Sequence, residues 1–325
     1  MRAPHAVAVV ITEPAYVGTV GNVAALAEIT HAHDAPLIVD AAWAPHFGFH
    51  DDLPRHALQQ GADAMVVSAH KTLPAWSQAA MVLARTNRLD AQRIETAVEV
   101  THTTSPAGAI LASIDASRAL LARDGANLLG AVIAAVSRLR DQLTGIPGLV
   151  IPSGPLVDPT KVTLVLPGTG ADGTAVEQRL LSLGMPLELA DRDTIVAIVT
   201  MADDAARIEV LGAALETAIQ AERGEPRTTA TASIWALAPV TRMSPRAAFF
   251  VDREVVAMEA AIGRVSAALI APYPPGIPVL APGEEITVEV VEVLREAQDA
   301  GTRIAYAADP TLTTLTVVTN PGVRR

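Results

Sequence analysis

Three residues able to do chemistry stand close together after one apolar segment of the sequence. Ser68, His70 and Lys71 lie at or just after the run Ala64–Ser68 (AMVVS). Burying an ammonium group is costly, so a lysine at the end of a buried strand is a candidate nucleophile for aldehydes. The alternative is a lysine that begins a surface loop. This short segment, taken alone, favours the surface loop.

A carboxylate after an earlier apolar run changes that balance. Asp40 ends the run Pro36–Asp40 (PLIVD), upstream of Lys71. A carboxylate paired with the pyridine nitrogen of pyridoxal phosphate (PLP) keeps this nitrogen protonated, as the cofactor requires in order to accept electrons. Asp40 followed by His70 and Lys71 resembles the pattern of fold-type-I PLP enzymes, and Ala42 is small enough to lie against a cofactor ring. Asp40 could instead cap a helix, but the two features in this order favour PLP chemistry.

These residues must be held at one edge of a sheet for such chemistry to occur. Residues 6–85 alternate short apolar runs with helical patterns, which predicts buried strands joined by helices. This arrangement is typical of an α/β fold with a mainly parallel sheet covered on both faces. The carboxyl ends of parallel strands meet at one edge, where Asp40 and Lys71 would then lie. The predicted strands are Ala6–Ile11, Pro36–Asp40, Ala64–Ser68 and Ala79–Ala84, and the predicted helix is Val23–His33.

The rest of the chain predicts two further domains. A long helix is predicted over Ala107–Leu143, with a break at Asp124 and Gly125. A small α/β domain follows, and the polar segment Arg223–Thr231 is typical of a linker. The further predicted elements are the strands Lys161–Leu166 and Thr194–Val199, the helices Gly173–Leu183, Asp203–Glu222, Arg253–Leu269 and Thr287–Ala300, the loop Tyr273–Pro282 and a final strand.

The Asp-x-Ala and Ser-x-His-Lys motifs also occur in cysteine desulfurases and class V aminotransferases, so other motifs must decide between reactions. Those motifs resemble the bacterial Orn/Lys/Arg decarboxylases, a family of fold-type-I PLP enzymes. The resemblance extends from Ala6 to about Ala300 and is most specific in the C-terminal part. The motifs are Ile11–Gly18, Val39–Phe47, Gly61–Asp63, Ser68–Pro74, Gln78–Met81, His102–Pro106, Ser244–Phe250, Gly263–Ser266, Tyr273–Pro278 and Pro282–Glu284.

The resemblance implies three domains. Residues 1–120 would form the C-terminal part of the PLP-binding large domain, residues 121–225 a small α/β domain, and residues 226–325 the α+β C-terminal domain of the decarboxylases. It also implies an upstream part, with a phosphate loop and an aromatic residue stacked on the cofactor ring, that we do not find before Ala6. Asn22, where many members have Asp, is a second departure.

The resemblance assigns roles to individual residues. Lys71 would carry PLP, Asp40 would hold its pyridinium and His70 would return a proton to the product. Glu284 would read the distal cation of the substrate. The remaining cofactor contacts would be Ala42 at the ring face, Trp43 near the phenolic oxygen, Ser68 near the phosphate together with His70, and Thr103 at the phosphate of a neighbouring subunit.

Several of these roles have simpler alternatives. Trp43 could be a core residue, Thr103 could cap the helix that follows it, and Glu284 could be an acid near the start of the next helix. If Thr103 reaches a neighbouring subunit, the protein is a homodimer or a higher oligomer with shared sites.

The implied reaction is PLP-dependent α-decarboxylation of lysine, ornithine or arginine to the corresponding amine, a step of polyamine biosynthesis. The absence of the upstream motifs leaves an alternative open. The chain would then be a non-catalytic homologue, or half of a split decarboxylase that acts with a partner subunit.

The composition argues against other functions. The chain has no cysteine, which excludes disulfides and thiolate metal sites. A net charge of -11 without a basic stripe argues against nucleic acid as a partner. Gly168, Gly170 and Gly173 form Gly-x-Gly-x-x-Gly, but this turn resembles the small domain of the decarboxylases, so we do not predict NAD. We find no membrane span and no signal peptide, and we expect a cytoplasmic protein.

Overall fold

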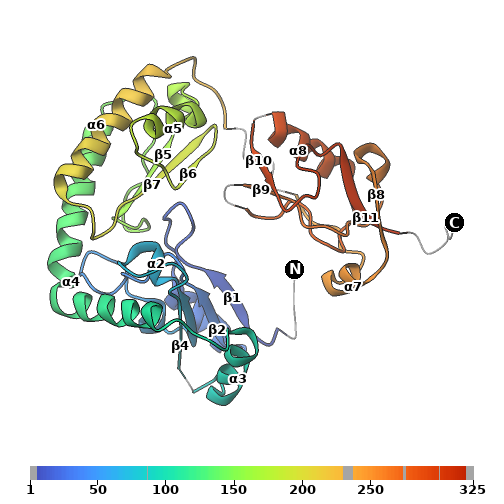
Figure 1. The fold of residues 1–325 in the computed structure, drawn as a ribbon, viewed down its shortest axis with the longest axis horizontal. Helices are drawn as coiled ribbons and strands as arrows, with labels where there is room; N and C mark the ends of the chain where they lie inside the picture. The colour runs from blue at the N-terminus through green and yellow to red at the C-terminus, as the bar shows by residue number, and fades with distance from the viewer. Residues whose placement is uncertain (1–5, 86, 230–236, 274–275, 300, 320–325) are drawn as a thin grey trace. The chain divides into compact units, whose positions relative to one another are not determined.

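The structure, a computed structural model, describes residues 6–85, 87–229, 237–273, 276–299 and 301–319 (Figure 1). The chain forms two compact units. The first consists of Met1–Ile146, Val150–Leu164 and Val196–Thr217, and the second of Pro147–Leu149, Val165–Ile195 and Ala218–Arg325.

A four-stranded sheet of order β1-β2-β3-β4 organises the first unit (Figure 1). The first three strands are parallel, and the last runs antiparallel to its neighbour. The prediction of an α/β fold with a mainly parallel sheet is therefore confirmed. The strands are β1 (Val9–Thr12), β2 (Leu37–Asp40), β3 (Ala64–Val67) and β4 (Met81–Ala84).

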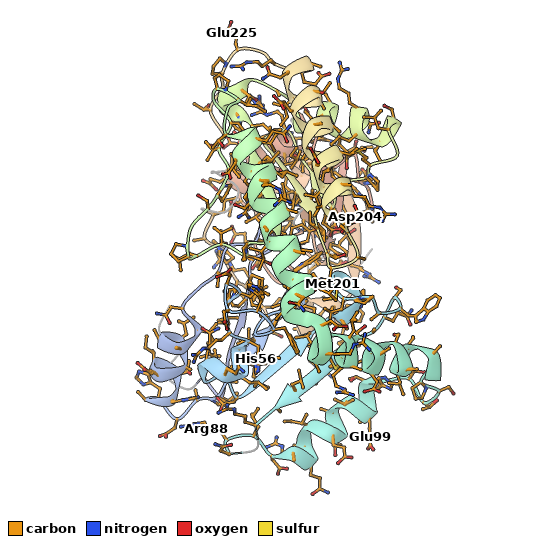
Figure 2. The ribbon with its side chains drawn as sticks, turned by 90° about the vertical axis from the view of Figure 1, so that its left-hand side faces the viewer. His56, Arg88, Glu99, Met201, Asp204 and Glu225 are labelled. Atoms are coloured by element: carbon orange, nitrogen blue, oxygen red, sulfur yellow. The ribbon has the colours of Figure 1, made fainter. Side chains whose placement is uncertain are left out.

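Short helices lie between these strands, and two longer helices follow the last strand. Asn22, the predicted departure from the family, accepts a hydrogen bond from the Ala25 amide and caps the first helix, as Asp would. Buried Asp63, which directly precedes β3, accepts a hydrogen bond from the Leu37 amide and so ties the start of β2 to the start of β3. The helices are α1 (Val23–His31), η1 (Ala57–Gln60), α2 (Ala69–Thr72), α3 (Ala91–Thr101) and α4 (Gly108–Leu143). Helix α3 buries no side chain, and its residue Glu99 is labelled in Figure 2.

Helix α4 is continuous, so the predicted break at Asp124 and Gly125 is wrong. Gly125 is buried within the helix, where a methyl group would meet the Leu121 side chain at 3.3 Å and the Phe49 Cβ at 3.6 Å. The glycine thus allows close packing instead of ending the helix. Figure 1 shows that the helix changes direction between its two halves.

By length and composition, α4 would be long and apolar enough to cross a membrane. Core helices of water-soluble proteins pass the same test. Leu121 and Leu129 of α4 pack in the same apolar cluster as the strands of the first sheet. Part of α4 therefore belongs to the core of the first unit, and 33% of its apolar 18-residue window is buried.

A second, three-stranded sheet has the order β5-β7-β6. Its glycine-rich turn, the Gly-x-Gly-x-x-Gly of the sequence, brings backbone segments into close contact. A methyl group on Gly168 would lie 2.3 Å from the Gly148 carbonyl oxygen, and one on Gly173 would lie 2.1 Å from the Asp191 carbonyl oxygen. The glycines therefore let backbone segments pack together. The elements are β5 (Lys161–Val165), η2 (Pro167–Thr169), α5 (Gly173–Ser182), β6 (Leu189–Ala190), β7 (Thr194–Ile198) and α6 (Ala205–Ala221).

In the C-terminal part, the predicted helix Arg253–Leu269 is wrong. Its first five residues form β8, which pairs antiparallel with the final strand. Val255 and Val256 are β-branched, and long-range pairing with a partner strand outweighs the helical pattern. The elements are α7 (Pro245–Phe250), β8 (Arg253–Ala257), η4 (Met258–Ala261), β9 (Ala271–Tyr273), α8 (Val288–Asp299), β10 (Arg303–Ala305) and β11 (Thr314–Val318).

A buried polar network supports the turn that carries Lys71. His46 follows β2 and is 2% exposed. Its Nδ1 lies 3.2 Å from the hydroxyl of Thr72, the residue after Lys71, and its Nε2 lies 3.3 Å from Oδ2 of Asp158. The Thr160 hydroxyl donates to Oδ1 of Asp158 at 2.7 Å. The network therefore joins α2 to the segment that leads into β5.

Burial alone would raise the pKa of the Asp158 carboxyl. The charge and hydrogen bond of His46, together with hydrogen bonds from Thr160, outweigh burial and hold this pKa below its ordinary value. A carboxyl with a lower pKa in the folded state stabilises the fold above its unfolded-state pKa. That stability is lost as the pH falls through the folded-state pKa.

We expect Asp158→Asn to lower the free energy of unfolding by about 3 kcal/mol near neutral pH, because it removes one partner of a buried pair. The difference from wild type should shrink below about pH 4, since acid protonates Asp158 in the wild type as well. Urea unfolding at several pH values measures both effects.

The control is Asp115→Asn, which removes an exposed ion pair with Arg118 and should cost less than about 1 kcal/mol. Equal losses in the two variants, or a loss that stays constant in acid, would contradict this account.

Candidate active site

The carboxyl ends of β2 and β3 bring most of the predicted site residues to one edge of the sheet. Asp40 is the last residue of β2 and is paired in register with Val66 of β3. Ser68 directly follows β3, and Lys71 lies on the short helix α2 that begins after it. Parallel pairing of two adjacent strands thus places a carboxylate and an amine at the same edge.

A turn follows Asp40 at the end of β2, so the alternative that Asp40 caps a helix is wrong. Its Oδ1 accepts a hydrogen bond from the Ala42 amide at 3.1 Å, and residues 41–56 contain no helix. This bond fixes the carboxylate relative to the backbone just beyond the strand. Asp40 is exposed and Ala42 is half-buried, so both can meet a ligand.

Trp43 lies between two lysine side chains and a tyrosine. The Lys71 Nζ is 4.4 Å from the centroid of the indole ring, and the Lys161 Nζ is 3.8 Å from it. The Tyr16 ring meets the same indole edge-on, with the centroids 5.3 Å apart. Trp43 is buried, as its alternative core role predicts, and its ring still contacts the amine of Lys71.

Lys161 and Tyr16 were not among the predicted site residues. They reach Trp43 from distant parts of the sequence, and no short motif indicates this. One compositional signal was available for Lys161. Lysine and arginine together number 24, but Lys71 and Lys161 are the only two lysines in the sequence.

The side chain of His70 is oriented by a backbone carbonyl. Its Nδ1 lies 2.8 Å from the Ala79 carbonyl oxygen, and the His70 amide donates to the same oxygen at 3.3 Å. A carbonyl only accepts, so this contact assigns a proton to Nδ1. The Nε2 atom is then the nitrogen that can exchange a proton with a ligand.

Ser68 stands at the N-cap of α2, but its side chain makes no capping hydrogen bond. The half-buried hydroxyl is therefore not used by the helix. Together, this edge offers a carboxylate, an amine, an imidazole, a hydroxyl and an aromatic face. Such a set can hold an anionic, aromatic aldehyde.

Thr103 and Glu284 each make a local hydrogen bond in the structure. Thr103 is exposed after α3, and its hydroxyl accepts from the Ser105 amide at 3.3 Å. It does not cap α4, whose N-cap is Ala107. Its role toward a neighbouring subunit stays a prediction.

Glu284 lies in the second unit, where its Oε2 accepts a hydrogen bond from the Ala281 amide at 2.8 Å. This carboxylate orders a turn, and α8 begins only at Val288. The alternative role at the start of the next helix is therefore not what the structure shows. The predicted contact with a substrate stays a prediction.

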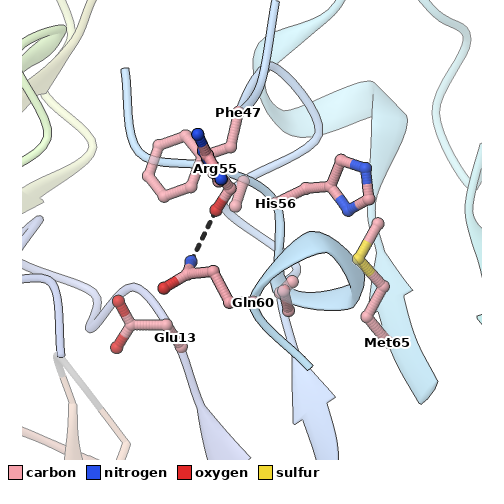
Figure 3. Close-up of a pocket in the computed structure, with 9 residues that line it drawn as sticks. Glu13, Phe47, Arg55, His56, Gln60 and Met65 are labelled. Carbon is pink, nitrogen blue, oxygen red and sulfur yellow. Dashed lines mark hydrogen bonds between the residues drawn. The ribbon is translucent and has the colours of Figure 1, made fainter. Parts of the chain in front are cut away.

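A small cavity next to β1 is not this site. Glu13, Arg55 and Gln60 help to line it, with the Gln60 amide donating to the Arg55 carbonyl at 2.6 Å (Figure 3). Burial raises the pKa of Glu13, although a hydrogen bond from the Gly21 amide opposes the shift. At about 10 Å³ the cavity has room for about one water molecule, so it excludes a cofactor.

Comparison with known protein families gives two matches. The model of the Orn/Lys/Arg decarboxylase major domain matches residues 2–149. The model of the C-terminal domain of the same family matches residues 228–304. The predicted resemblance to this family is therefore confirmed.

Similar proteins agree with these matches. The arginine decarboxylase of Halalkalibacterium halodurans is 33% identical, over 97% of this chain and 66% of that protein. The arginine decarboxylase of Bacillus subtilis is 31% identical over the same shares. The chain thus spans slightly less than two thirds of the length of these relatives.

A solved structure supports the fold. The constitutive lysine decarboxylase of Escherichia coli superimposes with a TM-score of 0.80 at 21% identity, covering 96% of this chain and 58% of that one. At this identity the likeness establishes the fold. Taken with the two domain models and the curated relatives, it shows that the chain belongs to the Orn/Lys/Arg decarboxylase family.

Proposed function

We propose that this chain takes part in PLP-dependent α-decarboxylation of a basic amino acid. The observation that carries the proposal is the placement of Asp40 and Lys71 at adjacent strand ends, with Trp43 against the lysine amine. The family assignment supports it, and so do the relatives named arginine decarboxylase and lysine decarboxylase.

The residues present fit the cofactor. Asp40 offers an anionic group for a protonated pyridine nitrogen, and Lys71 offers an amine for an aldehyde. Ser68 has a hydroxyl that the helix does not use, suitable for a phosphate oxygen. Ala42 leaves room for a ring face. When bound, PLP supplies an electron sink for the pair of electrons released at Cα as carbon dioxide departs.

Side chains of this chain would hold the cofactor, transfer a proton and cover the lysine amine. Asp40 would keep a proton on the pyridine nitrogen, and the Lys71 Nζ would hold the cofactor through its aldehyde. The His70 Nε2 is placed to return a proton, since Nδ1 is held by the Ala79 carbonyl. Trp43, which is 6% exposed, covers one side of Lys71.

We propose lysine, ornithine or arginine as the substrate, with Glu284 as the acid that reads its distal cation. The net charge of -11 would favour the approach of a cationic substrate. The proposed setting is the cytoplasm and polyamine biosynthesis. In the proposed homo-oligomer, residues 121–225 form the small domain and Thr103 reaches the phosphate site of a neighbouring subunit.

A second candidate is half of a split decarboxylase that acts with a partner subunit. Exposed apolar side chains on the two edge strands of the first sheet favour it. Val10 of β1 is 67% exposed and Val82 of β4 is 49% exposed. Exposed edge strands are suited to pairing with further strands.

Lys71→Ala should abolish the visible absorption band that wild-type protein develops with PLP. Borohydride reduction followed by peptide mass spectrometry should find the cofactor on Lys71. The background is narrow, because Lys161 and the terminal amine are the only other primary amines. Label on Lys161 instead of Lys71 would refute the assignment of Lys71.

Asp40→Asn should lower the rate of carbon dioxide release from the preferred substrate by about 10²–10³-fold, since a charge that stabilises the transition state is lost. The rate is measured separately with lysine, ornithine and arginine. Asp34→Asn, an exposed position at φ 55° where Asn is tolerated, is the matched control. Wild-type rates in both variants would rule out the role given to Asp40.

The split-enzyme candidate predicts dependence on a second polypeptide. We expect PLP affinity to rise at least tenfold when the chain is mixed with the part of Bacillus subtilis arginine decarboxylase that lies outside the match. Equilibrium dialysis with PLP measures the affinity. Equal affinity with and without that segment would rule out this candidate.

A further inference from the structure

The two lysines of the sequence meet at one aromatic ring. Lys71 and Lys161 are ninety residues apart, yet both ammonium groups lie within 4.4 Å of the Trp43 ring centroid. Lysine and arginine together number 24 in the sequence, and all of them except these two are arginines. The proposed function uses Lys71 and gives Lys161 no role.

Lys161 is held in place along its whole length. It is 4% exposed, and its stem packs on Gly18, where an added methyl group would lie 2.7 Å from Cγ and 2.8 Å from Cβ. Gly18 also has φ +85°, a conformation that favours glycine. The absence of a side chain at Gly18 therefore gives the lysine stem its path toward Trp43.

The backbone of Lys161 is fixed as well. The Arg140 guanidinium of α4 donates to the carbonyl oxygens of Lys161 and Asp158. The Lys161 amide donates to the Asp158 carbonyl at 3.2 Å. Two residues further along, the Thr163 hydroxyl donates to the Val17 carbonyl at 2.8 Å. These bonds fix the backbone position from which the lysine stem extends toward the indole.

A cation over the face of a tryptophan is attracted by the ring quadrupole, and more strongly where water is excluded. At 3.8 Å from the centroid, the Lys161 ammonium lies within the range of this interaction. Tyr16 meets the ring edge-on, so contacts with Lys161 and Tyr16 together fix the indole beside Lys71.

We propose that Lys161 is a positioning residue that holds Trp43 in the orientation needed beside Lys71. Its effect on cofactor and substrate rests on the proposed function and passes through the indole. Its effect on the indole itself is independent of PLP.

The test compares Lys161→Met, which keeps the stem and removes the charge, with Lys161→Arg, which keeps a cation that can stack on indole. The near-ultraviolet circular dichroism of the cofactor-free chain reports on the indole, and Trp43→Phe identifies the contribution of Trp43. Lys161→Met should lose most of that contribution and Lys161→Arg should retain it. Arg138→Met, an exposed charge removal on α4, should change nothing.

PLP affinity provides the second readout. Lys161→Met should weaken it about tenfold in the wild-type background and less than twofold in the Trp43→Phe background, because the lysine acts through the indole. Equal weakening in both backgrounds would overturn the proposal, and so would an unchanged Trp43 signal. If wild-type protein binds no PLP, the proposed function fails while the dichroism still decides the role of Lys161. If Lys161→Met does not fold, the comparison of Lys161→Arg with wild type decides it, since loss of the Trp43 signal there would contradict a cation–π role.

Discussion

Parallel pairing of β2 with β3 is the constraint on which the site depends. Because both strands run in the same direction, their carboxyl ends reach the same edge, and Asp40 aligns with Val66 two residues before Ser68. If the pairing of β2 with β3 slipped by one residue, the alternating side chains would turn to the opposite face of the sheet. Asp40 would then be separated from Lys71 on α2. The apolar side chains of Leu37, Val39 and Val67 fix this register through their burial.

Helix α2, which carries Lys71, is held by a buried polar network whose members take no part in the proposed chemistry. His46, Asp158 and Thr160 are buried and satisfy one another, and the imidazole also contacts Thr72. Such a network is stable only while every member keeps its partner. Stability of the fold and placement of Lys71 are therefore linked through Thr72, the direct neighbour of the lysine.

Local patterns were enough to predict the strands of the first sheet and the residues at their ends, because apolar runs and the polar residues after them are read within a few positions. Lys161, Tyr16 and the pairing of His46 with Asp158 could not be predicted in this way, since these contacts join segments far apart in the chain. The predicted helix Arg253–Leu269 is wrong for the same reason, because its first five residues pair with β11, which lies more than fifty residues further along the chain. The predicted break at Gly125 is wrong because α4 continues through this glycine, where an added methyl group would lie 3.3 Å from the Leu121 side chain.

The pairing of both lysines with one indole has a consequence for the chemistry of the whole surface. Sugars, acyl donors and reactive aldehydes modify proteins chiefly at lysine amines, and here Lys161 is buried and Lys71 is only half-exposed. Apart from the terminal amine, Lys71 is therefore the amine within reach of these reagents, and the other cations of the Lys and Arg class on the surface are arginines. An amine-directed reagent added to the folded protein would therefore report on the surroundings of Lys71, and so would glycation or acetylation of the Lys71 side chain.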